Sequence, residues 1–356
     1  MCIIMTVLLI IKRFDFGGAE NHVCDLGNSL VQKGHRVIIV GGSGRQLARL
    51  HPDIKNIIVK FRDILIPLHI LKILFIIKKY NVDIIHAHQR LAILIGSIAG
   101  FISGRKVVAT IHGRAKYDLK HFLSRRILSK IIFVSRFVFK ATPQRYNIHK
   151  KSVFIPNGVI AVEDNYCPKP YRIGYISKLN KTHSIFLELF INNVMPIIIQ
   201  KYNDVELYII GEGKSFNEIK ELVKEFNQRN KRNYCHIVGY EQCVHNHFRY
   251  LSLVMGVGRV ALEAASSGVP VLLANNKRIG GLLTIEKYHE VKDTNFVDVK
   301  APKPDTEKIV NEIISFFEND KKYKEEAKKM SVMIKEEFSL DIITDKIISL
   351  YEKAKK

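Results

Sequence analysis

The sequence has no tryptophan, and its five cysteines are scattered without a Cys-x-x-Cys pair. Disulfide-stabilised small folds and zinc ribbons both need closely spaced cysteines, so these two classes are excluded. The thiols are expected to be reduced, which points to a cytoplasmic protein. Long apolar runs are scarce as well: residues 91–103 form a run of thirteen, and a bilayer-spanning helix needs about 20. That run predicts a core helix.

Acidic residues are few. The chain has 34 aspartates and glutamates against 56 lysines and arginines, a net charge of +22. Residues 1–165 hold most of the excess, with a net charge of +17, against +5 for residues 166–356. Residues 105–151 contain 13 basic residues and one acid, Asp118. Such a patch suits nucleic acid, an anionic membrane or a polyanionic substrate, and composition alone does not decide among them.

The length of 356 residues favours two domains. In the front half, apolar strands alternate with helices, which is typical of a parallel sheet covered on both faces. A helix is predicted over residues 19–33, directly after Gly17 and Gly18. Strands are predicted over residues 3–11, 36–40, 56–60, 82–86, 106–111, 130–134 and 152–155. No basic residue precedes the first of these, so a buried strand is expected there and not a signal peptide.

Ligands of parallel sheets bind beyond the carboxyl ends of the strands. Six residues end or follow predicted strands and are therefore expected at one crevice: Gly17, Gly18, His86, His112, Gly113 and Ser135. For the histidines at positions 86 and 88, an ordinary satisfied polar group at a strand end is favoured over a ligand-binding one.

The stretch over residues 254–274 reads as a loop, a helix and a buried strand. Gly256 and Gly258 open the backbone before a predicted helix over residues 259–267, and Gly268 stands at its expected C-cap. A glycine-opened helix start after a strand concentrates free N–H groups and positive dipole, which suits a phosphate. Glu263 lies about 6 Å, or one turn, inside that helix, where it could contact a sugar hydroxyl. An ordinary glycine-capped helix with a solvated Glu263 fits the stretch equally well.

A second set of strands is predicted over residues 172–176, 205–210, 234–239, 251–254 and 270–274, after a linker at residues 163–170. Lys178 and Lys181 follow the first of these strands, and a helix is predicted after them over residues 185–201. Two basic side chains at one strand end can neutralise a diphosphate, although exposed loop charges have the same spacing. The predicted boundaries are residues 1–165, 166–336 and a final helical segment at 337–356.

Two stretches, residues 68–80 and 118–130, combine an apolar stripe with lysines and arginines. Either could lie flat on an anionic membrane. A helix that faces the core with a basic outer side is the alternative for each. The charge of the 105–151 segment favours the membrane.

Several segments together resemble the nucleotide-sugar glycosyltransferases of the GT-B architecture, specifically the retaining family 4, or group 1, type. The similarity covers nearly the whole chain and rests on the order and spacing of GGAENHVCDLGNSLVQKGHRVIIV, VDIIHAH, VVATIHG, IIFVS, IPNGV, YISKLNKTH, VELYIIGEG and GVGRVALEAASSGVPVLLA.

The resemblance implies an α/β fold of two Rossmann-like, doubly wound parallel-sheet domains facing across a cleft, with a final helix that crosses back to the first domain. It implies that Gly17 and Gly18 approach the donor phosphates, that His112 lies by the transferred sugar, and that Lys178 contacts the diphosphate. Glu263 would bind the ribose. No metal or cofactor is implied, because basic side chains and a helix dipole offset the charge of the leaving diphosphate.

Three positions depart from the family pattern. Met255 replaces the first glutamate of the paired-glutamate motif, Lys178 replaces an arginine, and His183 replaces a lysine. Lysine keeps a charge but loses the two-pronged geometry of arginine. We hypothesise that Arg259, in the first turn of the phosphate-facing helix, supplies part of the missing charge.

The predicted function is transfer of a sugar from a nucleoside-diphosphate sugar to a lipid-linked or saccharide acceptor, with retention, in the synthesis of cell-surface polysaccharide or glycolipid. The predicted location is cytoplasmic and peripheral on the inner membrane face. A sugar-nucleotide 2-epimerase on the same fold is one alternative, and a non-catalytic binding module with a degenerate donor site is the other. Nucleic acid is not an expected partner, because aromatic stacking platforms are absent.

Overall fold

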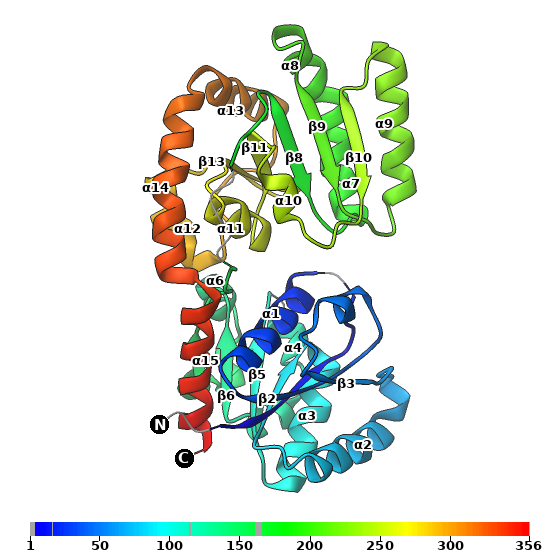
Figure 1. Ribbon diagram of the computed structural model, residues 1–356, viewed down its shortest axis with the longest axis vertical. Helices are drawn as coiled ribbons and strands as arrows, with labels where there is room; N and C mark the ends of the chain where they lie inside the picture. Colours follow the sequence, from blue (N-terminus) through cyan, green and yellow to red (C-terminus); the bar gives the residue numbers. More distant parts are fainter. Residues whose placement is uncertain (1–3, 16, 114, 161–165, 356) are drawn as a thin grey trace. The chain divides into compact units, whose positions relative to one another are not determined.

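The computed structural model describes all residues except 1–3, 16, 114, 161–165 and 356. It divides into two compact units (Figure 1). Unit 1 comprises Met1–Gly158 and Leu340–Lys356, and unit 2 comprises Val159–Ser339. The division thus falls before the predicted boundary at residue 165, which lies outside the described residues. Unit 2 begins where the N–H of Val159 donates to the carbonyl of Phe338, at 2.9 Å.

Unit 1 alternates strands and helices, as its sequence predicts. Its elements are β1 (Thr6–Ile11), α1 (Gly18–Gln32), β2 (Arg36–Gly41), β3 (Lys55–Ile58), α2 (Ile66–Lys79), β4 (Ile84–His88), α3 (Arg90–Ser103), β5 (Lys106–Ile111), α4 (Ala115–Asp118), α5 (Phe122–Ile127), β6 (Lys130–Phe133), α6 (Arg136–Lys140), β7 (Ser152–Phe154) and α15 (Leu340–Lys355). All seven strands are parallel, in the order β3-β2-β1-β4-β5-β6-β7.

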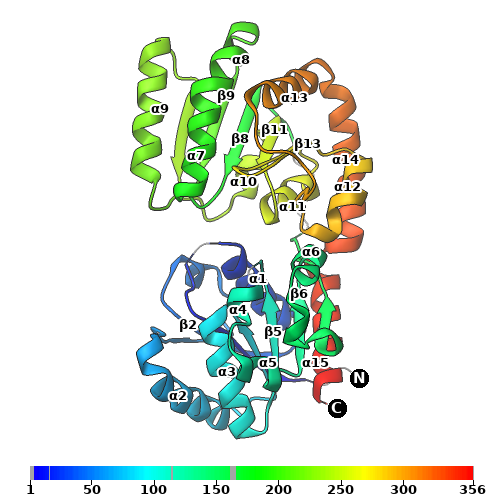
Figure 2. The same cartoon turned by 180° about the vertical axis from the view of Figure 1, so that it is seen from behind.

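The two faces of this sheet are covered by different helices because successive strand residues point to opposite sides. On β1, Leu8 and Ile10 pack with α2 and α3, whereas Val7, Leu9 and Ile11 pack with α1 and α15. Figure 1 shows α15, in red, beside α1, and Figure 2 shows α2 and α3 on the reverse side. The last helix of the chain is therefore part of the first sheet's core.

Unit 2 holds the remaining elements, and several begin or end a few residues from their predicted limits. They are β8 (Arg172–Ile176), α7 (Lys181–Leu189), a π-helical turn (Phe190–Val194), α8 (Met195–Lys201), β9 (Glu206–Ile210), α9 (Phe216–Asn230), β10 (Cys235–Gly239), α10 (His245–Phe248), β11 (Leu253–Gly256), α11 (Arg259–Ser266), β12 (Val271–Ala274), β13 (Ile279–Leu282), α12 (Ile285–Val291), α13 (Thr306–Glu318) and α14 (Asp320–Phe338).

The sheet of unit 2 runs β10-β9-β8-β11-β12-β13. Its first five strands are parallel, and β13 is antiparallel to β12. Sequence patterning missed β13, since Ile-Gly-Gly-Leu is too short and too rich in glycine to show a strand period. The predicted α/β class with two doubly wound sheets is confirmed, and the second sheet has this added edge strand.

Two helix predictions need correction. A continuous helix over residues 118–130 is wrong: α4 ends at Asp118 and α5 starts at Phe122, after His121 in extended conformation (φ −80°, ψ 123°). The helix predicted from residue 185 starts at Lys181, because the Asn180 side chain caps the N–H groups of Thr182 and His183, with 3.0 and 3.4 Å between the bonded atoms.

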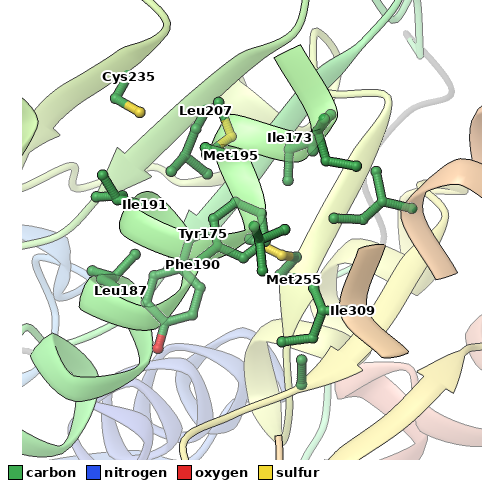
Figure 3. Close-up of a cluster of buried hydrophobic side chains, with 14 of the residues drawn as sticks. Ile173, Tyr175, Leu187, Phe190, Ile191, Met195, Leu207, Cys235, Met255 and Ile309 are labelled. Atoms are coloured by element: carbon green, nitrogen blue, oxygen red, sulfur yellow. The ribbon is translucent and has the colours of Figure 1, made fainter. Parts of the chain in front are cut away.

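One helical segment of the described chain, Lys181–Lys201, is long and apolar enough to cross a membrane by length and composition alone. In this structure the apolar side of the segment lies in the core of unit 2 (Figure 3). Leu187, Phe190, Ile191 and Met195 are fully buried there, against β8, β9 and β11.

Candidate functional site

In each unit the strand order reverses at one point of the sheet, and this is where open α/β sheets bind ligands. In unit 2 the reversal lies between β8 and β11, which are neighbours in register from Ile173 and Leu253 onward. Lys178 follows the end of β8 by two residues, and Gly258 follows the end of β11 by two residues. The sheet thus brings the ends of both predicted donor-binding segments to one edge.

The turn between β11 and α11 has a backbone that only glycine adopts easily. Gly258 is the N-cap of α11, with φ 69° and ψ −136°. Its N–H donates to the carbonyl of Phe296 at 3.4 Å, and a Cβ on it would meet the Nδ2 of Asn295 at 3.3 Å. The next three amides open α11 and have no carbonyl one turn earlier in the helix to bond. The predicted anion-binding turn is therefore present, with the 295–296 segment beside it.

Asn295 and Phe296 were not found by sequence reasoning. Both have left-handed φ, at 57° and 55°. For a bulky residue such as phenylalanine this conformation is costly, about 1–3 kcal/mol. A glycine at position 295 or 296 would have indicated a left-handed turn in the sequence, but neither residue is glycine. Only the folded backbone therefore shows that this segment supports Gly258.

Arg259 and Glu263 form an ion pair within α11, with 2.5 Å between Nε and Oε1. Both side chains are about 10% exposed. A solvated glutamate, the alternative interpretation of this helix, is thereby excluded. The pair places one cation in the first turn, next to Gly258, and holds one carboxylate a turn further in.

Met255 lies within β11 and is completely buried. It pairs in register with Tyr175 of β8 and Leu272 of β12, and Figure 3 shows it in the hydrophobic cluster beside Tyr175 and Ile309. A glutamate here would have to be buried among apolar side chains, at a cost of several kcal/mol. The methionine therefore places an apolar side chain in the core at the position where the family pattern has a carboxylate.

The loop that holds Lys178 is fixed by two glycines that follow β9. A Cβ on Gly211 would lie 1.9 Å from the carbonyl oxygen of Ser177, and one on Gly213 would lie 2.1 Å from that of Leu179. The N–H of Leu179 donates to the carbonyl of Glu212 at 3.1 Å. The backbones on either side of Lys178 are thus held, and its side chain is exposed.

Lys181 and His183 contribute less positive charge than the family pattern suggests. Lys181 pairs with Glu218 at 3.0 Å and its side chain is 72% exposed. Burial lowers the pKa of His183, whose Nδ1 lies 2.7 Å from the hydroxyl of Tyr175. His183 is therefore neutral at pH 7 and does not supply the charge of the lysine that the family pattern has at this position. The assignment of Lys181 to the donor stays a prediction.

In unit 1 the strand order reverses between β1 and β4. Gly17 is the N-cap of α1, with φ 153°, and no atom of the described residues lies within 4 Å of a Cβ built on Gly18. Glu20 in the first turn of α1 accepts a hydrogen bond from Gln89 at 3.0 Å, which ties α1 to the residue between β4 and α3. The backbone at Gly18 is thus open beside the strand ends.

Three histidines meet at this edge of unit 1: His22 from α1, His88 from the end of β4, and His112 directly after β5. One ring nitrogen of each lies within 4.8 Å of the others. The Nδ1 of His88 is 3.3 Å from the Nε2 of His112. The Nε2 of His88 is buried and has no hydrogen-bond partner in the described part of the chain, so the prediction that His88 is a satisfied strand-end group is wrong for that atom.

His86 behaves as predicted. Its Nδ1 lies 2.6 Å from the hydroxyl of Tyr351, and its Nε2 lies 2.7 Å from the hydroxyl of Thr110. Burial lowers its pKa to about 3, helped by the neighbouring His112. Burial also holds the pKa of His88 well below its usual range. Sequence reasoning singled out His112 but missed His22, whose position on a helix gives no local signal.

Comparisons with known proteins follow the same division of the chain. The family model Glycosyltransferase Family 4 matches residues 16–161, and the model Glycosyl transferases group 1 matches residues 170–319. The Schizosaccharomyces pombe phosphatidylinositol N-acetylglucosaminyltransferase gpi3 subunit is 23% identical over 310 residues, which are 77% of this chain and 65% of that protein. A human phosphatidylinositol N-acetylglucosaminyltransferase subunit is 25% identical over 300 residues, 75% of this chain and 60% of that one. The chain thus spans less than two thirds of the length of these relatives.

Solved structures share the fold at low identity. The Anabaena HepE structure in complex with UDP and glucose has a TM-score of 0.73 and 17% identity, over 98% of this chain and all of that one. A putative UDP-N-acetylglucosamine 2-epimerase from Listeria monocytogenes has a TM-score of 0.65 and 14% identity, over 99% and 98% of the two chains. With both family models in their expected order on two such sheets, the chain belongs to the GT-B glycosyltransferases of the family 4, group 1 type.

Proposed function

We propose that the protein transfers a sugar, with retention, from a nucleoside-diphosphate sugar to a lipid-linked or saccharide acceptor. The observation that supports this best is the pairing of β8 with β11, which sets Lys178 and the Gly258 turn beyond neighbouring strand ends. A lysine and a helix N-terminus at one sheet edge suit a diphosphate. The HepE structure named above contains UDP and glucose, and the same class of donor fits this edge.

The residues then have distinct roles. The amides after Gly258 would bind the diphosphate, Lys178 and Arg259 would offset the charge that grows on it as it leaves, and Glu263 would bind the ribose. The Arg259–Glu263 ion pair supports this assignment, because the arginine holds that carboxylate in place one turn inside α11. Gly17, Gly18 and His112 of unit 1 would face the phosphates and the transferred sugar.

The reaction needs no side-chain nucleophile. The diphosphate departs from an oxocarbenium-like centre, and the acceptor hydroxyl attacks from the same face. Dipoles and cations that are already oriented cost no reorganisation at the moment when charge develops. We propose no metal or cofactor for this chemistry.

An acceptor in a membrane is supported by the surface of unit 1. On α2, Leu71 and Phe75 are each 63% exposed, and Lys72, Lys78 and Lys79 lie on the same helix. Exposed apolar groups beside lysines suit an anionic lipid surface. We propose that unit 1 binds the cytoplasmic membrane face peripherally, as expected in cell-surface polysaccharide or glycolipid synthesis.

A thermal-shift series with nucleoside diphosphates and their sugars tests the donor. A donor present at 100 times its dissociation constant stabilises the folded chain by about 2.7 kcal/mol. If no nucleoside diphosphate or sugar raises the melting temperature, the chain is a binding module without a working donor site.

Product analysis with labelled donor tests the reaction. Sugar joined to an acceptor with its anomeric configuration kept supports the proposal, and inverted product excludes retention. A free epimer would assign the chain to 2-epimerase chemistry. This is a definite alternative because the putative 2-epimerase from Listeria monocytogenes has a similar fold.

A further inference from the structure

The three histidines at the edge of unit 1 have the composition of a transition-metal site. His22, His88 and His112 come from three separate elements, and one ring nitrogen of each falls within 4.8 Å of the other two. Neutral imidazole is the histidine form that binds metals, and it suits zinc and its neighbours in the periodic table. Within the described ranges of the chain no carboxylate belongs to this group, which argues against magnesium or calcium, since these ions take oxygen ligands.

The spacing within the group agrees with this chemistry. The Nδ1 of His88 and the Nε2 of His112 are 3.3 Å apart. Two nitrogens on one tetrahedral zinc ion, with bonds of about 2.0–2.1 Å, are separated by roughly 3.3 Å. The His22 ring centroid lies 4.9 Å from that of His112 and 5.5 Å from that of His88, so His22 is the third ring beside this pair and must move closer to share one ion with them.

The surroundings favour the neutral ligand form. His88 is completely buried, and its ring lies 4.3 Å from that of His86, which Tyr351 and Thr110 hold in place by hydrogen bonds. Protonation of these buried rings is unfavourable because burial penalises the charged form.

We propose that His22, His88 and His112 bind one Zn²⁺ or a similar divalent ion of the first transition row, with a fourth position left for solvent. The consequence of binding rests on the proposed function, in which His112 lies by the transferred sugar. An ion bound to His112 withdraws this side chain from the substrate. The ion therefore inhibits sugar transfer and is not required for it.

Metal content gives the direct test. The full chain, stripped with a chelator, is dialysed against Zn²⁺, and bound zinc is measured by mass spectrometry. We expect about one equivalent, with affinity reduced at least tenfold in His22→Asn and in His88→Asn. The control His51→Asn, which removes a more exposed histidine of the same unit, should retain the zinc. No bound zinc in the wild type, or equal binding in the His22→Asn/His88→Asn double variant, overturns the site.

A measurement on the wild type covers the case in which these variants do not fold. With Co²⁺ in place of Zn²⁺, imidazole ligands give the visible absorption of a four-coordinate ion without a thiolate charge-transfer band. A thiolate band would assign the ion to cysteine, such as the buried Cys24 of α1, and would overturn the proposal.

Turnover of nucleotide sugar with and without Zn²⁺ tests separately whether the bound ion inhibits sugar transfer. Inhibition by one equivalent that a chelator reverses supports it, and undiminished turnover by the zinc-loaded chain overturns it. A chain that holds zinc on these histidines but turns over no nucleotide sugar in either state leaves the metal site established and counts against the proposed function.

Discussion

The hydroxyl of Tyr351 on α15 lies 2.6 Å from the Nδ1 of His86 on β4, although 265 positions separate the two residues. The aromatic ring and the imidazole also meet edge to face, with 5.6 Å between centroids. Both side chains are fully buried. The last helix of the chain is thus fixed to the centre of the first sheet by a polar contact inside an apolar core.

Tyr351→Phe should lower the free energy of unfolding of unit 1 by about 1–3 kcal/mol, because it leaves a buried imidazole nitrogen without its partner. Urea denaturation followed by circular dichroism measures the change. Tyr323→Phe is the matched control, since its hydroxyl contacts Ser315 at 3.3 Å in a half-buried setting of unit 2. Equal losses in the two variants would show that the His86 contact contributes nothing specific.

Stability should fall as the pH is lowered through the range below 6.5. The pKa of His86 is lowered to about 3 by burial and by the neighbouring His112, so the unfolded chain takes up a proton there that the folded chain does not. The contribution is fully present above pH 6.5 and is lost progressively down to about pH 3. Between pH 7.5 and 5.5 the loss from this group is about 1.4 kcal/mol. Denaturation of chelator-treated protein at the two pH values checks this, and His86→Gln should reduce the dependence, with the part due to the buried His88 remaining.

Gly258→Ala should weaken donor binding at least tenfold. The alanine would need a φ of 69° and would bring its Cβ to 3.3 Å from Asn295, so the start of α11 must shift. Gly268→Ala is the control: it carries a similar φ of 72°, but its Cβ would meet its nearest neighbour, Ser331, only at 4.0 Å. Both variants should lose about 1–2 kcal/mol of stability, and only the first should lose donor affinity in calorimetric titration.

Lys178→Ala and Arg259→Ala should each reduce donor affinity, because each removes a cation from the proposed diphosphate site. We expect a loss of about 1.5–3 kcal/mol for each charged hydrogen bond. Lys224→Ala, an exposed lysine on α9 paired with Glu221, is the control. If Arg259→Ala binds donor as tightly as the wild type while Lys178→Ala does not, Arg259 does not compensate for the missing family cations.

Binding of the full chain to anionic vesicles should be salt-sensitive and should depend on α2. Leu71→Ser combined with Phe75→Ser removes two exposed apolar groups and leaves the lysines of the helix in place. Flotation with vesicles containing phosphatidylserine should show at least a threefold loss. Ile185→Ser, at a position of α7 with 50% exposure, is the control in unit 2. Wild-type protein that does not float at low salt would refute the membrane proposal.

Local sequence signals located the sheets and the glycine turns reliably. Apolar strands bounded by turn residues gave the parallel βα order, and Gly256, Gly258 and Gly268 framed α11. These features depend on neighbours in the chain, so the sequence contains the information directly. The strand β13 was missed because its two glycines leave no side-chain alternation to detect.

The partners of individual side chains could not be obtained in this way. Asn295 and Phe296 reach the Gly258 turn from nearly 40 positions away, and the assignment of Met255 to the core depends on how far β11 extends.

The sequence alone specifies two doubly wound sheets and, in the second, a glycine turn of the kind that binds phosphate. Both features depend on backbone geometry and on hydrophobic periodicity, which are set by residues close together in the chain. The meeting of His22, His88 and His112, and the closure of Tyr351 on His86, become visible only in the folded chain. Such contacts join elements that are distant in the chain, and they form because burying both faces of a sheet fixes which helices cover it.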